Sequence, residues 1–266
     1  MNQRNLDYLQ NQLKYTGFGE NLTDQLKENL AKENSRFVLV HKAQYGKDEL
    51  TAALQFSRSM QSELYFFNSY KASLAKSGQG GGPSQRFYIG KEGSNITLKE
   101  AYNLLDGRSV HKDMTTRQGR LYQAWLQLDF KNTLPNGNFK MLQFGRNYGF
   151  DLFESLKKLP IQEIHVQADR VKILDSLKKG NRQQVTLSGP SDGQKVFIEA
   201  NPQFKAIILY DSSYHRMRQS PQAPAVSEER SQAVKQDDKT QKNSADRTQR
   251  YEQNETKSTK AKGLSR

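Results

Sequence analysis

Apolar side chains alternate with polar ones along residues 121–130, the stretch that best defines how this chain is organised. Ala124, Leu126 and Leu128 fall on one face of an extended segment, while Gln127 and Asp129 fall on the other. This alternation predicts a half-buried β-strand. Residues 136–137, Asn-Gly, follow in a short polar break and tolerate the positive φ of tight hairpin turns. The pattern therefore predicts an antiparallel hairpin whose second strand covers about residues 139–144.

The first 35 residues carry leucines at helical spacing in two runs. Leucine recurs at positions 6, 9 and 13 and again at 22, 26 and 30, with Gly17 and Gly19 between the runs. The spacing predicts a helical hairpin in which Phe18 packs between the two helices. We expect this amphipathic pair to pack on a sheet, and docking to a partner protein is the alternative.

Other elements follow from β-favouring runs and from helix capping signals. Thr97 and Glu100 have the spacing of a capping box, and Gly107 ends the short helix that they begin. Later patterns predict helices at 152–159 and 169–179. Strands are predicted at 37–41, 51–56, 63–67, 86–89, 184–187, 195–200 and 204–210.

Together these elements predict an α+β protein, built of antiparallel hairpins and a meander with short packing helices. We divide the chain into an N-terminal helical hairpin (1–35), a first β-rich half that ends in a short helix (36–106), a second α+β half with the central hairpin (107–215) and a basic tail (216–266). The tail has 12 Lys or Arg, 7 Asp or Glu and few large apolar residues. Because it cannot bury enough apolar surface to offset its chain entropy, we predict that it is disordered.

The net charge of +13 directs attention to anionic partners. The tail contributes +5 and residues 1–215 contribute +8, so positive charge belongs to the fold as well as to the tail. Nucleic acid is the commonest polyanionic partner of a basic intracellular protein. Simple solvation of the surface by Lys and Arg is the alternative.

Several classes of chemistry lack their sequence signals. The chain has no cysteine, which excludes disulfides and thiolate metal sites, and its four histidines do not stand at metal-ligand spacing. The glycine-rich segment 77–84 leads into Pro83 and a strand, whereas a phosphate loop needs a lysine and a hydroxyl that open a helix. We expect no metal, no cofactor and no catalytic residues, although an active site without a linear motif stays open.

The lengths of the apolar runs also indicate the cellular compartment of the protein. The N-terminus lacks the apolar stretch of a signal peptide, and no run approaches the length of a membrane span. We therefore expect a cytoplasmic protein without a membrane partner.

The remaining signal is a set of basic residues with aromatic residues between them. Lys and Arg neutralise phosphates, and exposed aromatic rings stack on the bases of single strands. Tyr122 and Trp125 fall on opposite faces of their strand, and we expect Trp125 to belong to the core. The predicted nucleic-acid contacts are Arg108, Lys112, Arg117, Arg120, Arg146, Lys178, Lys179 and Arg182, with Tyr148 as a stacking residue.

Six segments follow one another along residues 37–211: ITLKEAYNLLDGRSVHKD, YQAWLQLDF, NGNFK, QFGRNYGFDL, SLKKGNRQQVTL and KVFIEANPQFKAIILYD. In this order they resemble an uncharacterised domain family of conjugative and mobilisable elements in Bacteroidetes-type bacteria. Some members carry the domain beside topoisomerase-like modules, which implies work around DNA transfer or maintenance. The family supplies no catalytic residues that could be carried over.

These observations favour a non-enzymatic accessory protein of a mobile genetic element that binds nucleic acid mainly through phosphate contacts. The alternative is a protein-interaction module that docks a conjugation or topoisomerase component through the leucine-rich hairpin or a sheet edge. An antagonist of host defence ranks last, because it would more naturally be acidic.

Overall fold

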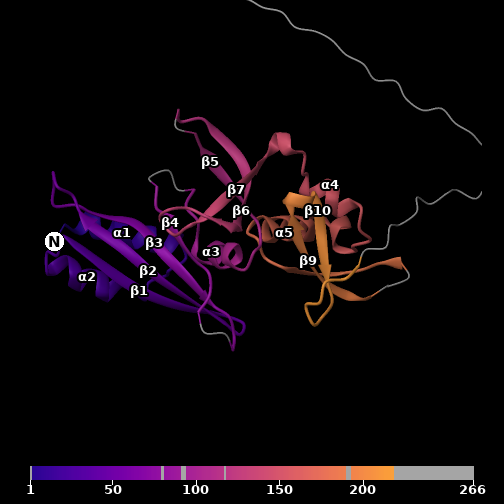
Figure 1. Ribbon diagram of the computed structural model, residues 1–266, viewed down its shortest axis with the longest axis horizontal. Helices are drawn as coiled ribbons and strands as arrows, with labels where there is room; N and C mark the ends of the chain where they lie inside the picture. The colour runs from indigo at the N-terminus through magenta and orange to yellow at the C-terminus, as the bar shows by residue number, and fades with distance from the viewer. Residues whose placement is uncertain (1, 79–80, 91–93, 117, 190–192, 219–266) are drawn as a thin grey trace, which may run out of the picture. The chain divides into compact units, whose positions relative to one another are not determined.

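The computed structural model describes residues 2–78, 81–90, 94–116, 118–189 and 193–218, and these form an α+β fold (Figure 1). Within these residues the α-helices are α1 (Gln3–Tyr15), α2 (Thr23–Ala31), α3 (Leu98–Leu105), α4 (Leu152–Lys157) and α5 (Gln167–Lys178). The strands of the first sheet, in the order β1-β2-β3-β4, are β1 (Arg36–Tyr45), β2 (Asp48–Arg58), β3 (Tyr65–Ala75) and β4 (Ser84–Tyr88). The second sheet contains β5 (Val110–Thr115), β6 (Leu121–Thr133) and β7 (Phe139–Gly145), and the third, in the order β10-β9-β8, contains β8 (Gln183–Thr186), β9 (Lys195–Asn201) and β10 (Ala206–Tyr210). Every ladder is antiparallel, which confirms the predicted α+β class.

The predicted helical hairpin is present as α1 and α2, which pack on the first sheet (Figure 1). All six leucines at helical spacing are buried, and so is Phe18 in the connection. The Phe18 ring meets the rings of His41, Phe67 and Tyr70 edge-on, at centroid distances of 5.6, 6.0 and 5.1 Å. His41 is thus a packing residue. The leucine pattern is therefore explained by packing of both helices on the first sheet.

The strand β3 extends well beyond the predicted residues 63–67. A bulge lies at Asn68, because Gln55 pairs with Ser69 while the next residue, Phe56, pairs with Phe67. The bulge brings Phe67 and Tyr70, an odd number of positions apart, onto the same buried face. This breaks the period of two on which strand prediction depends, and it explains why the second half of β3 was not predicted.

The helix α3 begins as predicted at a capping box. The Thr97 hydroxyl accepts a hydrogen bond from the Glu100 backbone N–H, and the Glu100 carboxylate accepts one from the Thr97 N–H at 2.8 Å. Beyond it, the polar segment that was predicted as a connection forms the edge strand β5 instead. Val110 is its one fully buried apolar side chain, so its composition carries almost no strand signal.

The second sheet separates two hydrophobic cores. Ala124, Leu126 and Leu128 on one face of β6 join the core of α1–α3 and the first sheet. Trp125 and Phe144 on the other face join a core formed by α4, α5 and the third sheet. The first core thus crosses the predicted boundary at residues 106–107, and β6 belongs to both cores.

The β6–β7 hairpin turns at Asn136-Gly137 as predicted. Gly137 has φ of +80°, and its N–H donates to the carbonyl oxygen of Leu134 at 2.9 Å. The Asn136 side chain accepts a hydrogen bond from the N–H of Asn138 at 3.0 Å. These bonds satisfy the backbone of the turn and fix the register of the hairpin.

The chain after β10 is ordered for slightly longer than predicted. Arg216 forms an antiparallel bridge with Tyr210, and the Met217 N–H donates to the carbonyl oxygen of Leu209 at 2.8 Å. Met217 also packs against the second core. Residues 216–218 therefore belong to the fold, and the rest of the predicted tail lies outside the described residues.

Candidate nucleic-acid interface

Strands β5–β7 and the short 3-10 helix η1 (Arg146–Tyr148) surround an open hollow of about 750 Å³, which we call the aromatic groove. The β6–β7 hairpin ends at Gly145, and the sharp turn through η1 brings Tyr148 back against Phe144. Gly149, with φ of +82°, closes this turn. The residues that line the groove are His111, Tyr122, Gln123, Trp125, Phe144, Gly145, Arg146, Asn147, Tyr148 and Phe150.

The floor of the groove is part of the second core. Trp125 is 5% exposed, and its ring meets His111 and Phe150 edge-on at centroid distances of 5.2 and 5.5 Å. This bears out the expectation that Trp125 is a core residue. Tyr148 is an exposed ring at this site, and its role as a stacking residue stays a prediction.

Contacts from a distant part of the chain hold Tyr148 in place. Its hydroxyl donates to the carbonyl oxygen of Gln203 in the 3-10 helix η4 (Pro202–Phe204) at 2.7 Å. The ammonium of Lys205 lies 4.9 Å from the centre of the Tyr148 ring. An exposed ring that is fixed by a hydrogen bond loses little entropy when a base stacks on it.

The rim of the groove is positively charged. Arg146 is exposed, and neither it nor Lys205 forms an ion pair within the described part of the chain. Burial lowers the pKa of His111, and the nearby positive charge of Lys178 lowers it further, against the opposing effect of Asp113. This lowered pKa favours the neutral form of His111, so the cations of this region are Arg146, Lys178 and Lys205.

Arg108 and Lys112 were predicted to contact phosphate from an exposed connection, but both side chains are largely buried. The Arg108 side chain is only 6% exposed, and its Nη2 lies 3.0 Å from Oδ2 of Asp106. The Lys112 side chain is 14% exposed, and its Nζ lies 3.1 Å from Oε2 of Glu100. Lys112 lies in β5, which packs against α3, and Arg108 lies in the short turn between α3 and β5. Both cations therefore form internal ion pairs.

The other predicted residues lie apart from the groove. Arg182 is half-buried, with its Nε 2.8 Å from Oε2 of Glu199. Lys179 is exposed at the end of α5, and Arg120 is exposed just before β6. Arg117 lies outside the described residues. The structure thus brings together Arg146 and Tyr148, with Lys178 nearby, and adds Lys205, which sequence analysis missed because 57 positions separate it from Tyr148.

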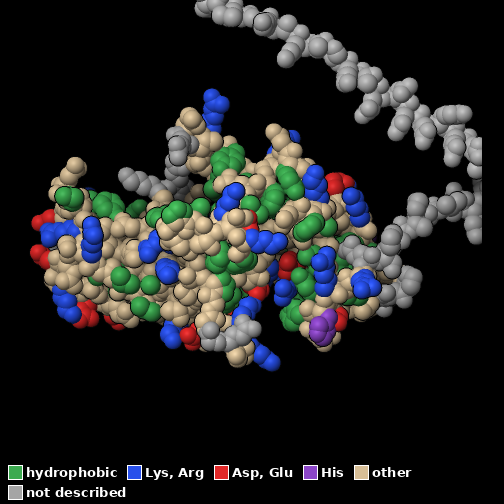
Figure 2. Space-filling model, viewed as in Figure 1, with side chains coloured by type: hydrophobic (Ala, Val, Ile, Leu, Met, Phe, Trp, Pro, Cys, Tyr) green, Lys and Arg blue, Asp and Glu red, His purple; other side chains and the backbone are tan. Residues whose placement is uncertain are grey.

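Positive charge is concentrated in the same half of the chain as the groove. Residues 107–215 have 16 Lys or Arg and 10 Asp or Glu, a net charge of +6, whereas residues 1–106 have a net charge of +2. On the face shown in Figure 2, basic side chains outnumber acidic ones over the part that contains α4, α5 and β9. An anionic strand at the groove would therefore meet a favourable field.

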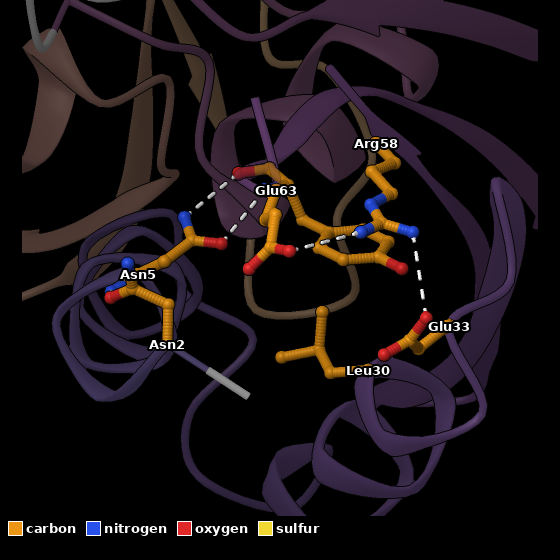
Figure 3. A pocket seen from close by; sticks show the side chains of 7 residues that line it. Asn2, Asn5, Leu30, Glu33, Arg58 and Glu63 are labelled. Atoms are coloured by element: carbon orange, nitrogen blue, oxygen red, sulfur yellow. Dashed lines mark hydrogen bonds and ion pairs between the residues drawn. The ribbon is translucent and has the colours of Figure 1, made fainter. Parts of the chain in front are cut away.

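A second hollow, between α1, α2 and the start of β3, has a different character (Figure 3). Arg58 lies between Glu33 and Glu63, at 3.7 and 3.9 Å, and the Asn5 amide exchanges two hydrogen bonds with the backbone of Tyr65 at 3.0 and 2.8 Å. Its charged groups pair with one another, and with two glutamates against one arginine its net charge is negative. This hollow attaches α1 to β3 and does not suit an anionic ligand.

Two kinds of site are absent from the part of the chain that the structure describes. No three or more His, Asp or Glu side chains gather there in a group that could hold a metal ion. None of the described helices is long and apolar enough to cross a membrane. The features of the aromatic groove that bear on a ligand are its aromatic rings and its positive charges. Comparison of the chain with protein-family models, curated proteins and solved structures finds no match.

Proposed function

We propose that this protein binds nucleic acid without catalysing a reaction, and that the aromatic groove is the binding site. The observation that carries the proposal is the fixed, exposed ring of Tyr148, with Lys205 over it and Arg146 in the same short helix, while Lys178 acts on His111 in the same groove. Cations beside a stacking ring are the combination that single-strand binding proteins use, because the charges follow the phosphates while the ring meets a base. We therefore propose that single strands bind more tightly than duplexes.

The family resemblance supports the proposal that this activity belongs to a mobile genetic element. The segments QFGRNYGFDL and KVFIEANPQFKAIILYD, on which the resemblance partly rests, contain Arg146, Tyr148 and Lys205 of the groove. We propose that the protein is an accessory factor that acts around DNA transfer or maintenance, in the cytoplasm.

The first prediction concerns charge reversal at the rim of the groove. Arg146→Glu with Lys205→Glu should weaken single-strand binding at least tenfold at low salt, because two phosphate contacts are lost. The slope of log affinity against log salt should become less steep by about 1.4. Fluorescence anisotropy of the full chain with a labelled single-stranded 20-mer, at several salt concentrations, measures both quantities.

The matched control makes the same charge change away from the groove. Lys27→Glu with Lys71→Glu replaces two exposed lysines of α2 and β3 and should change the affinity much less. An equal loss in both double variants would mean that net charge alone drives binding and would reject the groove as the site.

One observation favours protein docking as a second candidate function. The strand β1 is an edge strand, and Val38 and Val40 on the outer face of the sheet are 52% and 53% exposed. Val38 aligns across the sheet with the exposed Tyr88 of β4, through Gln55 and Ser69. An edge strand with exposed apolar side chains suits the addition of a strand from a partner such as a conjugation or topoisomerase protein.

The second prediction tests this edge. Val38→Asp with Val40→Asp should abolish co-purification of a partner protein from host cells, without changing single-strand affinity. Val171→Asp on α5, which replaces a valine that is 49% exposed, is the control and should retain the partner. Retention of the partner by the double variant would remove the edge of β1 from consideration.

A further inference from the structure

A separate hollow of about 690 Å³, which we call the tyrosine cleft, lies where four segments of the fold meet. These segments are the β1–β2 turn, α3, the end of α5 with the start of β8, and the chain after β10. Among the residues that line it are Tyr45, Lys47, Lys99, Arg108, Arg182 and Tyr214. The cleft shares no lining residue with the aromatic groove.

The wall of the cleft is held together by a close contact between α3 and the end of α5. The Asn103 side chain is fully buried, and its Nδ2 donates to the carbonyl oxygen of Lys179 and to Oδ1 of Asn181, at 2.5 and 3.0 Å. Gly180 has φ of +78°, and a Cβ there would stand 2.8 Å from the carbonyl oxygen of Ser109. Only glycine fits this approach. The wall of the cleft is therefore fixed by close packing and hydrogen bonds between α3 and the end of α5.

Aromatic rings hold one of the cations at the cleft. The rings of Tyr45 and Tyr102 stack at a centroid distance of 4.3 Å, and the Lys99 ammonium lies 4.2 and 4.8 Å from their centres. A cation over two rings is positioned without a carboxylate partner. Lys99 and Lys47 have neither an ion pair nor a side-chain hydrogen bond to any other described residue.

The carboxylates of the cleft are already satisfied by other groups. Asp48 accepts from the Lys76 ammonium at 3.0 Å and from the Tyr102 hydroxyl at 3.1 Å. Asp106 accepts from Lys76 and pairs with Arg108. Glu199, outside the lining, pairs with Arg182. The lining has two acids, Asp48 and Asp106, and four cations, Lys47, Lys99, Arg108 and Arg182, so its net charge is +2.

Two further features indicate a deficit of negative charge. Burial lowers the pKa of Lys99, and the charge of Arg108 lowers it further, against the opposing effect of Asp106. Arg108 is buried, and its Nε has no hydrogen-bond partner among the described residues. An anion bound beside Lys99 would offset the repulsion between these two cations.

We propose that the tyrosine cleft binds the phosphate group of a nucleotide-sized phosphate monoester, with Lys47 and Lys99 as its cationic contacts. A monoester carries close to two negative charges at neutral pH, which matches the net charge of the cleft. The volume lies within the range of small-ligand sites. The exposed ring of Tyr214, whose neighbour Phe197 stacks on it at 4.6 Å, offers an apolar surface to the organic part of the ligand.

The phosphate has two possible sources, a free mononucleotide and the 5′ end of a nucleic-acid strand. Isothermal titration calorimetry on the full chain with AMP, inorganic phosphate, and a short oligonucleotide with and without a 5′-phosphate separates them. Tighter binding of AMP than of the phosphorylated oligonucleotide identifies a free nucleotide. Binding of the oligonucleotide that depends on its 5′-phosphate and exceeds that of AMP identifies a strand end.

Variants decide whether the cleft is responsible. Lys47→Gln with Lys99→Gln should weaken the preferred ligand at least tenfold, while Lys27→Gln with Lys71→Gln should leave its affinity unchanged. The first pair should also leave the salt-dependent binding of an unphosphorylated single strand unchanged, since that strand occupies the aromatic groove. Equal affinities in both double variants, or no saturable binding of any phosphate probe at millimolar concentration, would overturn the proposal.

Discussion

Replacement of Asp106 by Asn is expected to destabilise the protein by about 3–5 kcal/mol, because it removes one partner of a buried ion pair. The Asp106 carboxylate is 11% exposed and lies 3.0 Å from Nη2 of Arg108, which is itself 6% exposed. It also accepts a hydrogen bond from Lys76. Asparagine keeps the size of the side chain but loses its charge, so a buried guanidinium is left without a counter-ion.

Urea unfolding of the variant, followed by far-ultraviolet circular dichroism, measures this loss. Asp175→Asn on α5 is the control, since Asp175 is exposed and has no ion pair within the described chain; its expected effect is within about 0.5 kcal/mol. A wild-type midpoint for Asp106→Asn would show that Arg108 reaches solvent. Arg108 would then return to the predicted phosphate contacts.

The ion pair between Asp106 and Arg108 could not be predicted from the sequence. Arg108 and Lys112 lie in a polar segment whose local composition is that of a solvated connection, and nothing nearby in the sequence shows that it pairs with β6. The acids that neutralise them are Glu100 on α3 and Asp106 at its C-terminal cap, and α3 was itself predicted from its capping box. Helix signals are local, whereas the burial of a cation depends on the packing of the strand that carries it.

The candidate sites show the same limit. Arg146 and Tyr148 could be predicted because a basic and an aromatic residue adjoin the central hairpin. Lys205 reaches Tyr148 only through the fold, and so does the pair of Lys47 with Lys99 at the tyrosine cleft. Residues that form a site across long separations leave no periodic pattern in the sequence. Of the aromatic groove, only the part that adjoins the hairpin and the end of one helix was predicted, and neither proposed contact of the tyrosine cleft, Lys47 or Lys99, was predicted.

Trp125→Ala is expected to cost about 3–5 kcal/mol, because truncation of a buried aromatic ring loses its transfer free energy and leaves a cavity. Trp125 is 5% exposed and lies in the second core, on the face of β6 opposite Leu126. Its ring edges meet His111 and Phe150, so the variant removes contacts to β5 and to the segment before α4. The variant thus loses packing within the second core and the ring contact with β5.

Circular dichroism in a urea titration is the appropriate measurement, since Trp125 is the single tryptophan and its variants lose the fluorescence signal. Trp125→Phe is the matched control, because it keeps an aromatic ring in the same place and should lose clearly less stability. Trp125 also forms the floor of the aromatic groove, so a well-folded Trp125→Phe protein should retain single-strand affinity if Tyr148 supplies the stacking. A wild-type midpoint for Trp125→Ala, with a loss of single-strand affinity in Trp125→Phe, would instead make Trp125 the stacking ring and Tyr148 a part of the support.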